Sequence, residues 1–582
     1  MHSHEQVIAS LPEHLRPFVA RQDYDAYTPR DHAIWRFLLQ QLNANLKHSA
    51  HPTYFEGLAA TGIGLDAIPR IEEMNACLSK LGWRAVVVDG FLPPAVFMEF
   101  QAIKVLVIAV NIRSFEHMLY TPAPDIVHES AGHAPFLIDI DYAEFLQRFG
   151  ECGMQAIASK ADWDVYEAVR ELSIVKERAD ASPSEIAAAE ARLEAANAAN
   201  SQPSEAALLS RLHWWTVEYG LVGELQNYEI FGAGLLSSLG ESQSCLDDTA
   251  VKKLPLTVNA IHTPYQITDP QPQLFVTESC RHLSQVLEEF SRHMCCHRGG
   301  ASALQEAVEA GSVNTATTNA GLQISGRFSR VITDAVGNAV YFNTEGPSQL
   351  AYQGKELSGH GIDYHKPGFG SPVGRLRAFE RCLSCYTVDE LKRHHIVEGE
   401  RVVLNFLSGI MVDGKLSRIV RRDQKNLIFS FQNCTVKDEA GHILFEPDWG
   451  TYDMSVGDQI VSVEGGSADQ HGFPLYDSPS QKVTQSQQYD AATQAQFEWY
   501  QKLGNARTQG VNTAELDSMI TEISNLQKAD WLLTFEALEL AQQQALAGEL
   551  QTQLRDSLIA QQQQGPEDVS TLIGYGLSRL GL

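Results

Sequence analysis

Residues 121–135 read TPAPDIVHESAGHAP, and the two histidines in this stretch determine what the rest of the chain is expected to hold. Neutral imidazole is the commonest metal ligand in proteins. His128 and His133 are five residues apart, whereas the zinc-protease pattern needs a spacing of four on one helix face. A regular helix would place two such rings about 140° apart around its axis. Chelation therefore requires a widened turn or a helix end, for which Gly132 provides local freedom; the alternative is two buried histidines without a metal.

A third ligand has to come from elsewhere in the chain, and residues 214–220, WWTVEYG, offer one. Glu218 lies among aromatic and apolar residues, where a carboxylate is costly unless it is paired or bound to a metal. A salt bridge to a nearby arginine or histidine is the alternative. Two histidines and one carboxylate form the facial triad of non-haem Fe(II) oxygenases, which leaves open positions on the metal.

Four blocks of sequence together resemble one family, the pterin-dependent aromatic amino acid hydroxylases. The blocks are residues 27–36 (YTPRDHAIWR), 124–135 (PDIVHESAGHAP), 215–221 (WTVEYGL) and 231–238 (FGAGLLSS). The likeness covers roughly residues 15–295 and is strongest to the bacterial-type phenylalanine 4-monooxygenases. It implies a mostly helical catalytic domain with short strands, holding Fe(II) and tetrahydropterin and acting on an aromatic amino acid with O₂.

The resemblance also implies roles for individual residues. The metal ligands and catalytic centre would be His128, His133 and Glu218. The pterin would contact Phe97 and Glu129. The amino acid substrate would be held by Arg113, Thr121, Trp214 and Ser237. Asp125 has two equal interpretations, a partner that orients a ligand histidine or a helix N-cap.

Substrate choice follows from weaker signals. Tryptophan-specific members tend to carry Phe at the position of Trp214, so the resemblance favours conversion of phenylalanine to tyrosine. Three departures from the family pattern, Ala95, the Ser130-Ala131 pair and His213, bear on pocket shape. Tryptophan or tyrosine hydroxylation remains an alternative, as does a non-catalytic sensor that binds iron or an amino acid with the same fold.

The chain divides into three predicted parts. Residues 1–300 form the catalytic domain, with a helical insertion at 160–207 in which Ser182, Pro183 and Glu185 form an N-terminal capping box. Within this part, 84–90 and 104–110 read as short strands and 208–225 as helix. The run FGAGLLSS at 231–238 indicates close approach of backbones.

The second half resembles nothing recognisable and is read from its patterns alone. Residues 326–480 alternate short β-rich runs with turns, which predicts an all-β domain of unassigned role. Residues 484–582 are helical and Gln-rich, and leucines at 546, 550, 554 and 558 form one apolar stripe. Such a stripe packs on its own domain or, alternatively, joins copies of the chain in a homo-oligomer.

Composition limits the possible partners. The 582-residue chain has 72 acidic and 44 basic residues, a net charge of −28 that is spread along the chain. Nucleic acid and anionic membranes need a basic footprint, so neither is expected. The sequence contains no apolar run approaching the roughly 20 residues of a membrane span and shows no secretory signal. A cytoplasmic location is therefore expected.

The nine cysteines read as reduced thiols, because they are sparse and mostly lone in a large intracellular chain. Cys382 and Cys385 form a CxxC pair with two histidines downstream, at His394 and His395. Zinc usually requires four ligands, so a lone CxxC favours two ordinary thiols over a zinc site.

Overall fold

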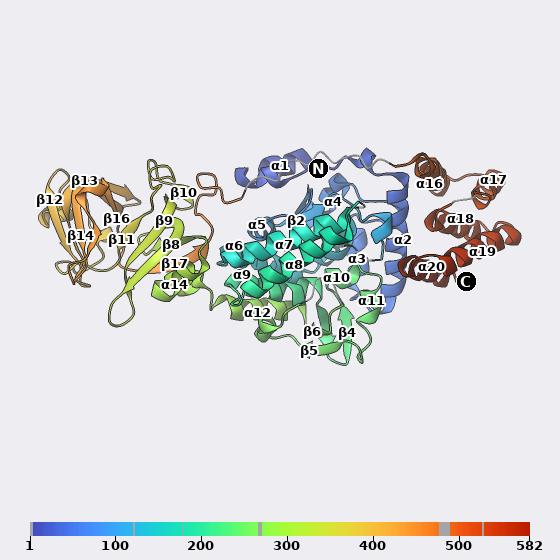
Figure 1. Cartoon of the computed structure of the whole chain (residues 1–582), viewed down its shortest axis with the longest axis horizontal. Helices are drawn as coiled ribbons and strands as arrows, with labels where there is room; N and C mark the ends of the chain where they lie inside the picture. Colours follow the sequence, from blue (N-terminus) through green and yellow to red (C-terminus); the bar gives the residue numbers. More distant parts are fainter. Residues whose placement is uncertain are drawn as a thin grey trace.

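The computed structural model describes residues 4–119, 121, 123–178, 180–265, 270–476, 489–526 and 529–582. Figure 1 shows three parts in a row: a β region at one end, a helical N-terminal region in the middle, and the C-terminal helices at the other end. Among the helices in these ranges, none combines the length and the apolar composition that a membrane crossing requires.

The first part of the N-terminal region is helical around one short parallel pair of strands. β1 (Arg84–Val88) and β2 (Val105–Ala109) are parallel and are joined by α5 (Pro94–Ala102), as the two short apolar runs predict. The surrounding helices are α1 (His4–Ser10), α2 (Pro29–Asn45), α3 (Thr53–Ala60), α4 (Ile71–Leu78) and α6 (Ile140–Gln155). A capping box at Thr28 and a proline at the first position start α2, the longest of these helices.

The predicted insertion consists of two antiparallel helices on the outside of this region. α7 (Lys160–Glu177) packs along α8 (Pro183–Ala199), and in Figure 1 both cross the face of the middle part. The capping box of Ser182 and Glu185 is confirmed by both of its hydrogen bonds. Only Ala189 of α8 is buried, so the helix keeps its Ala/Glu surface toward solvent.

A second small sheet follows the insertion and corrects one expectation. The helix predicted over 208–225 ends at Glu218, and Leu221 starts β3 (Leu221–Glu224). Gly220 lies between the two, and its backbone is too close to Thr216 and Phe231 to admit a side chain. The sheet order is β4-β3-β6-β5, with β4 (Asn227–Ile230), β5 (Lys252–Pro255) and β6 (Gln273–Thr277). The helices around it are α9 (Glu205–His213), α10 (Ala233–Leu236), α11 (Glu241–Ser244) and α12 (Cys280–Ser291).

The β region consists of two antiparallel sheets. The first contains β7 (Val313–Thr318), β8 (Leu322–Thr333), β9 (Ala339–Tyr352), β10 (Lys355–Glu356), β11 (Gly370–Pro372) and β17 (Ile460–Gly465). The second contains β12 (Arg401–Asn405), β13 (Met411–Arg422), β14 (Lys425–Lys437), β15 (Ile443–Phe445) and β16 (Tyr452–Ser455). β17 closes the first sheet beside β7, so the chain passes through the second sheet and returns.

This region starts earlier than residue 326 and is not purely β. The first strand, VNTATT, is polar and lacks the aromatic and β-branched apolar run that marks the later strands. Two helices ahead of it, α13 (Cys295–Arg298) and α14 (Gly300–Ala310), pack against β17. A short helix, α15 (Val388–Arg393), lies between the two sheets in sequence. The expected boundary at residue 300 therefore falls between two helices that both belong to this packing unit.

The C-terminal helices share the hydrophobic core of the N-terminal region. They are α16 (Ala491–Gln509), α17 (Thr513–Ser524), α18 (Trp531–Gln543), α19 (Gly548–Gln564) and α20 (Glu567–Arg579). α16, α18 and α20 pack on α2, where Phe37 meets Trp531 and Phe535 edge to face. The buried carboxylate of Glu536 pairs with Arg36 of α2 and Arg507 of α16. A buried charge needs such partners.

The leucine stripe predicted at 546–558 is buried within the chain. Leu550, Leu554 and Leu558 of α19 lie in the shared core, and α19 packs mainly on α18. Of the two alternatives, the stripe therefore packs within its own chain. A homo-oligomer through the C-terminal helices would have to use another of their faces.

Candidate metal centre

The two histidines of the opening stretch lie on a π-helix. η6 (Val127–His133) carries both of them, so of the two geometries that chelation would need, a widened turn or a helix end, the structure forms the widened turn. π-helical turns are rare and frequently occur at functional sites. The wider turn brings the two Nε2 atoms to 3.2 Å from each other, with the rings at 88°.

The carboxylate of Glu218 comes from a second π-helix, η8 (Trp214–Glu218). Its Oε2 lies 3.2 Å from Nε2 of His128, and its Oε1 lies 3.4 Å from Nε2 of His133. Burial alone raises the pKa of Glu218, but the two imidazoles beside it hold this pKa well below its usual value. The carboxylate is therefore ionised at neutral pH.

The three donor groups fit one metal ion. Bonds of roughly 2.1 Å at right angles place neighbouring donor atoms roughly 3.0 Å apart. The observed separations of 3.2, 3.2 and 3.4 Å are close to that value. Because the three donors occupy one side, the opposite positions on an ion would stay open, as in a facial triad.

Ser237 determines which ring nitrogen of His128 faces the other two donor groups. Its hydroxyl donates to the carbonyl of Ala233 at 2.8 Å, so toward the ring, 3.0 Å away, it can only accept. Nδ1 of His128 therefore carries the proton and donates to Ser237, which leaves the lone pair of Nε2 for a metal. Ser237, expected to contact substrate, thus hydrogen-bonds a histidine of the candidate triad.

Three glycines allow these elements to approach one another. A Cβ on Gly132 would lie 2.9 Å from the carbonyl oxygen of Ala233, and one on Gly232 would lie 2.5 Å from that of Glu218. Gly234 is similarly close to Glu218 and Tyr219. The close backbone approach predicted for residues 231–238 is confirmed, and Gly132 serves close packing as well as the turn.

Asp125 and Arg113 form a buried pair just before the π-helix. Nε and Nη2 of Arg113 each donate to the Asp125 carboxylate at 2.8 Å, a bidentate arrangement. Asp125 also accepts from the backbone N–H of His128 at 3.1 Å. Burial would raise the pKa of Asp125, but Arg113 keeps it below its usual value. Of the two interpretations, these contacts make Asp125 a cap of the histidine-bearing helix.

Glu129 lies beside the triad but at a greater distance. Its Oε2 is 4.0 Å from Nε2 of His133. Burial, only partly offset by His133, raises the pKa of Glu129 to about 8. Its carboxyl group is therefore largely protonated at pH 7 and can donate a hydrogen bond. Thr121, which the resemblance assigns to the substrate, is half-buried. Its hydroxyl donates to the carbonyl of Ala123.

Two further predicted site residues, Trp214 and Phe97, make contacts with other aromatic rings. Trp214 stacks on Tyr219 and on Tyr265, with ring centres 4.7 and 4.3 Å away. Phe97 of α5 is half-buried and meets the ring of His213 edge to face. These contacts place Trp214 against Tyr219, the residue after Glu218, and Phe97 against His213.

His213, which departs from the family pattern, lies beside Glu218. Its Nδ1 lies 3.6 Å from Oε1 of Glu218, and burial lowers its pKa to about 4. Its Nε2 has no hydrogen-bond partner within the described ranges. The ring is therefore neutral and borders the metal centre. The stacking of Tyr265 on Trp214 could not be predicted from the sequence, because the two residues are some fifty positions apart.

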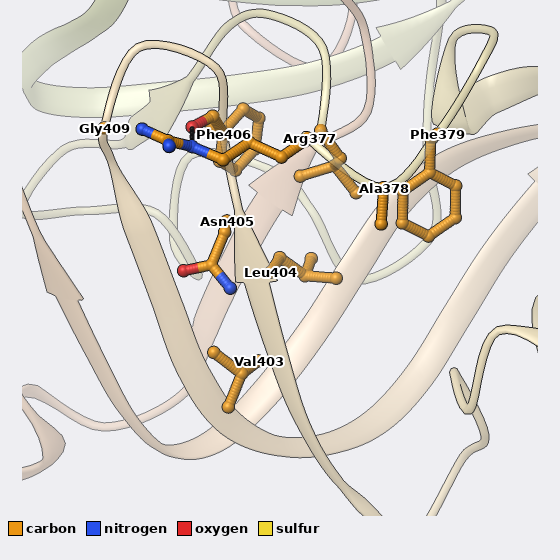
Figure 2. Close-up of a pocket in the computed structure, with 9 residues that line it drawn as sticks. Arg377, Ala378, Phe379, Val403, Leu404, Asn405, Phe406 and Gly409 are labelled. Atoms are coloured by element: carbon orange, nitrogen blue, oxygen red, sulfur yellow. Dashed lines mark hydrogen bonds between the residues drawn. The ribbon is translucent and has the colours of Figure 1, made fainter.

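The CxxC pair does not form a comparable cluster. Cys382 is buried and Cys385 is exposed, and no group of three potential ligands in the described residues includes either. His394 instead packs its ring against Phe379 and Tyr386. A cavity of about 330 Å³ adjoins Phe379 and is lined mainly by Arg377 and the strand residues Val403 to Phe406 (Figure 2). It lies by β12, at the far end of the β region from the triad (Figure 1).

A family model described as biopterin-dependent aromatic amino acid hydroxylase matches residues 21–170 and 188–298. The unmatched residues 171–187 lie inside the predicted insertion. The chain is 28% identical to the phenylalanine-4-hydroxylase of Pseudomonas aeruginosa over 277 residues, which are 47% of this chain and 88% of that protein. The Chromobacterium violaceum enzyme is 28% identical over 275 residues, 47% of this chain and 78% of its own length.

The solved structures with similar chains include that of Chromobacterium violaceum phenylalanine hydroxylase with bound iron(III) and 7,8-dihydrobiopterin. It is 25% identical, covers 50% of this chain and 90% of its own, and has a TM-score of 0.39. Together with the four sequence blocks, the family match leads to one conclusion. Residues 21–298 of this chain belong to the biopterin-dependent aromatic amino acid hydroxylases, close to the bacterial phenylalanine hydroxylases.

Proposed function

We propose that this protein is an iron- and tetrahydropterin-dependent monooxygenase that hydroxylates phenylalanine to tyrosine. The observation that carries the proposal is the convergence of His128, His133 and Glu218, with donor atoms 3.2 to 3.4 Å apart. The bacterial relatives named phenylalanine-4-hydroxylase support the choice of substrate. When bound, iron and tetrahydropterin supply the electrons that activate O₂, and the protein positions the reactants.

The proposed ligand set depends on its supporting residues. Ser237 holds the ring of His128 so that Nε2 faces the metal. Asp125 caps the π-helix that carries both histidines and holds Arg113 at the same time. Partners of this kind orient ligands and raise metal affinity.

Arg113 is the proposed anchor of the substrate carboxylate. Nε and Nη2 already donate to Asp125, so the contact with the substrate rests on Nη1. This arrangement orients the guanidinium before the substrate arrives, which lowers the entropic cost of binding. Thr121 is proposed to support the same end of the substrate.

The aromatic residues complete the proposed pocket. Trp214, stacked between tyrosines, forms the wall of the substrate's ring site. Phe97 is the proposed stacking surface for the pterin. Glu129, which lies 4.0 Å from His133, is proposed to hydrogen-bond the pterin. Closure of such a site around pterin and substrate excludes water.

The decisive test is turnover of phenylalanine, tyrosine and tryptophan by the Fe(II)-loaded full chain with a tetrahydropterin under air. We expect tyrosine from phenylalanine as the fastest reaction. Glu218→Ala should lower this rate at least about 100-fold, because metal catalysis contributes several kcal/mol. Glu224→Ala, which removes an exposed carboxylate from the nearby strand β3, should leave the rate unchanged.

Two results would redirect the assignment. Faster hydroxylation of tryptophan or tyrosine would keep the chemistry and change the substrate. Absence of product from all three amino acids, with iron bound, would favour the sensor alternative. The cytoplasmic location and a homo-oligomer remain predictions from the sequence.

A further inference from the structure

A second group of two histidines and one carboxylate lies in the β region, far along the chain from the first. His360, His365 and Asp453 are all buried, with 4, 6 and 5% of their surfaces exposed. Nδ1 of His360 lies 3.2 Å from Nε2 of His365, and one donor atom from each of the three residues lies within 4.8 Å of the others. Buried polar groups of this kind need partners.

The backbone holds both histidines in place. They lie in the irregular segment between β10 and β11, where the carbonyl of His360 accepts from Leu350 of β9 and that of His365 accepts from Ser348. The N–H of His365 donates to Gly361, which closes the turn between the two rings. The segment is therefore attached along β9, and the ring positions follow from its backbone.

Asp453 comes from the other sheet. It lies on β16, opposite Ser430 of β14, and the Ser430 hydroxyl donates to its carboxylate at 2.5 Å. Ser371 of β11 bonds Ser455 of β16, so the first sheet and β16 are in direct contact beside the cluster. The two histidines and the carboxylate thus meet across the junction of the two sheets.

The surroundings leave the carboxylate without a cationic partner. In the described part of the chain no lysine or arginine forms an ion pair with Asp453, whose carboxylate accepts a hydrogen bond from Ser430. Arg418 is exposed and acts on His360 only at a distance. Tyr364 lies edge-on to both imidazole rings and its hydroxyl interacts with Asp453. Two neutral imidazoles and one carboxylate carry a charge of −1 that a dication would offset.

We propose that His360, His365 and Asp453 form a second metal site, which binds a divalent transition-metal ion such as Zn²⁺ and ties the segment between β10 and β11 to the second sheet. Imidazole and carboxylate are ordinary ligands of zinc. Tetrahedral bonds of roughly 2.1 Å place donor atoms roughly 3.4 Å apart, so the histidine pair already fits. The carboxylate oxygen lies within 4.8 Å of both ring nitrogens, so it has to move inward by at most roughly 1.4 Å.

The test measures zinc on the full chain in a background that lacks the first site. His128→Ala/Glu218→Ala leaves a single ligand of the triad, so any tightly bound zinc must be held elsewhere. The chelator-stripped protein is loaded with Zn²⁺, desalted and analysed for metal. We expect one equivalent in this background and none when Asp453→Asn or His365→Ala is added.

Asp453→Asn is the critical variant, because the amide keeps the size of the side chain and the hydrogen bond from Ser430. His442→Ala, which removes an exposed histidine of the same region, should keep the equivalent of zinc. Circular dichroism shows whether each variant is folded. Two results would overturn the proposal. One is the absence of zinc from the His128→Ala/Glu218→Ala protein; the other is one equivalent of zinc that remains when Asp453→Asn is added and also when His365→Ala is added. Hydroxylation by the wild type is independent of this result.

Discussion

The chain holds two pairs of histidines at the same spacing of five residues, in two unrelated settings. His128 and His133 lie on a π-helix, whereas His360 and His365 lie in an irregular segment between strands. In both pairs the facing ring nitrogens are 3.2 Å apart. The spacing therefore does not specify the backbone. It only permits two rings to meet, and the local structure determines how.

The two clusters differ in access and in support. Side chains of His128 and Glu218 are 16 and 14% exposed, whereas all three residues of the second cluster are almost completely buried. In the first, a serine orients a histidine; in the second, a serine orients the carboxylate. An accessible metal with open positions suits chemistry, and a closed one suits the attachment of two sheets.

The strongest test of this contrast is removal of metal from the full chain loaded at both sites. A chelator should take the ion from His128, His133 and Glu218 first, because solvent reaches that site more easily. We expect complete loss of hydroxylation while about one equivalent of metal remains bound. Activity and bound metal are measured at successive times. Loss of both equivalents at one rate would remove the distinction between an accessible and a closed site.

A smaller effect separates the two serines. Ser237→Ala should lower metal affinity at the triad by about 10- to 100-fold, because the ring of His128 loses its orienting partner. Ser430→Ala should produce a change of similar size only at the second cluster. Titration of each variant with Zn²⁺, with the other cluster removed, gives the two affinities. An effect of either serine on the remote site would contradict the independence of the two clusters.

The smallest expected effect concerns the π-helix itself. Gly132→Ala places a methyl group 2.9 Å from the carbonyl oxygen of Ala233 and should cost about 1–3 kcal/mol of stability. Gly504→Ala, in helix α16 with open space around it, is the matched control and should stabilise by about 0.5–1 kcal/mol. Chemical denaturation measures both. Equal behaviour of the two variants would mean that close packing at Gly132 is unimportant.

The triad could be anticipated from sequence to an unusual extent. The spacing of His128 and His133 meant that chelation would need a widened turn or a helix end, and the structure forms a widened turn. Glu218 stood out because a carboxylate among aromatic residues needs a partner. The second cluster was missed, although His360 and His365 repeat the same spacing. Its carboxylate lies in a strand of alternating pattern, where Asp453 looks like an ordinary outward-facing residue.

Errors in the predicted elements have a common cause. The helix expected over 208–225 gives way to β3, because Leu221 pairs with Ile230 of β4 and Val276 of β6. The sheet starts before residue 326, because β7 is a polar strand that pairs with β8 and β17. The Gln-rich helices were predicted without a docking surface, and the structure buries apolar residues of α16, α18 and α20 against α2. Each of these outcomes depends on contacts between distant segments.

The sequence by itself determined the ligand types, the widened turn and the close approach of residues 231–238, because these depend on residue chemistry and local spacing. Only the tertiary structure decided that Ser237 orients His128, that Trp214 stacks on Tyr265, and that Asp453 joins two histidines of another sheet. Such pairings come from segments far apart along the chain, and their geometry is determined by packing of the whole domain.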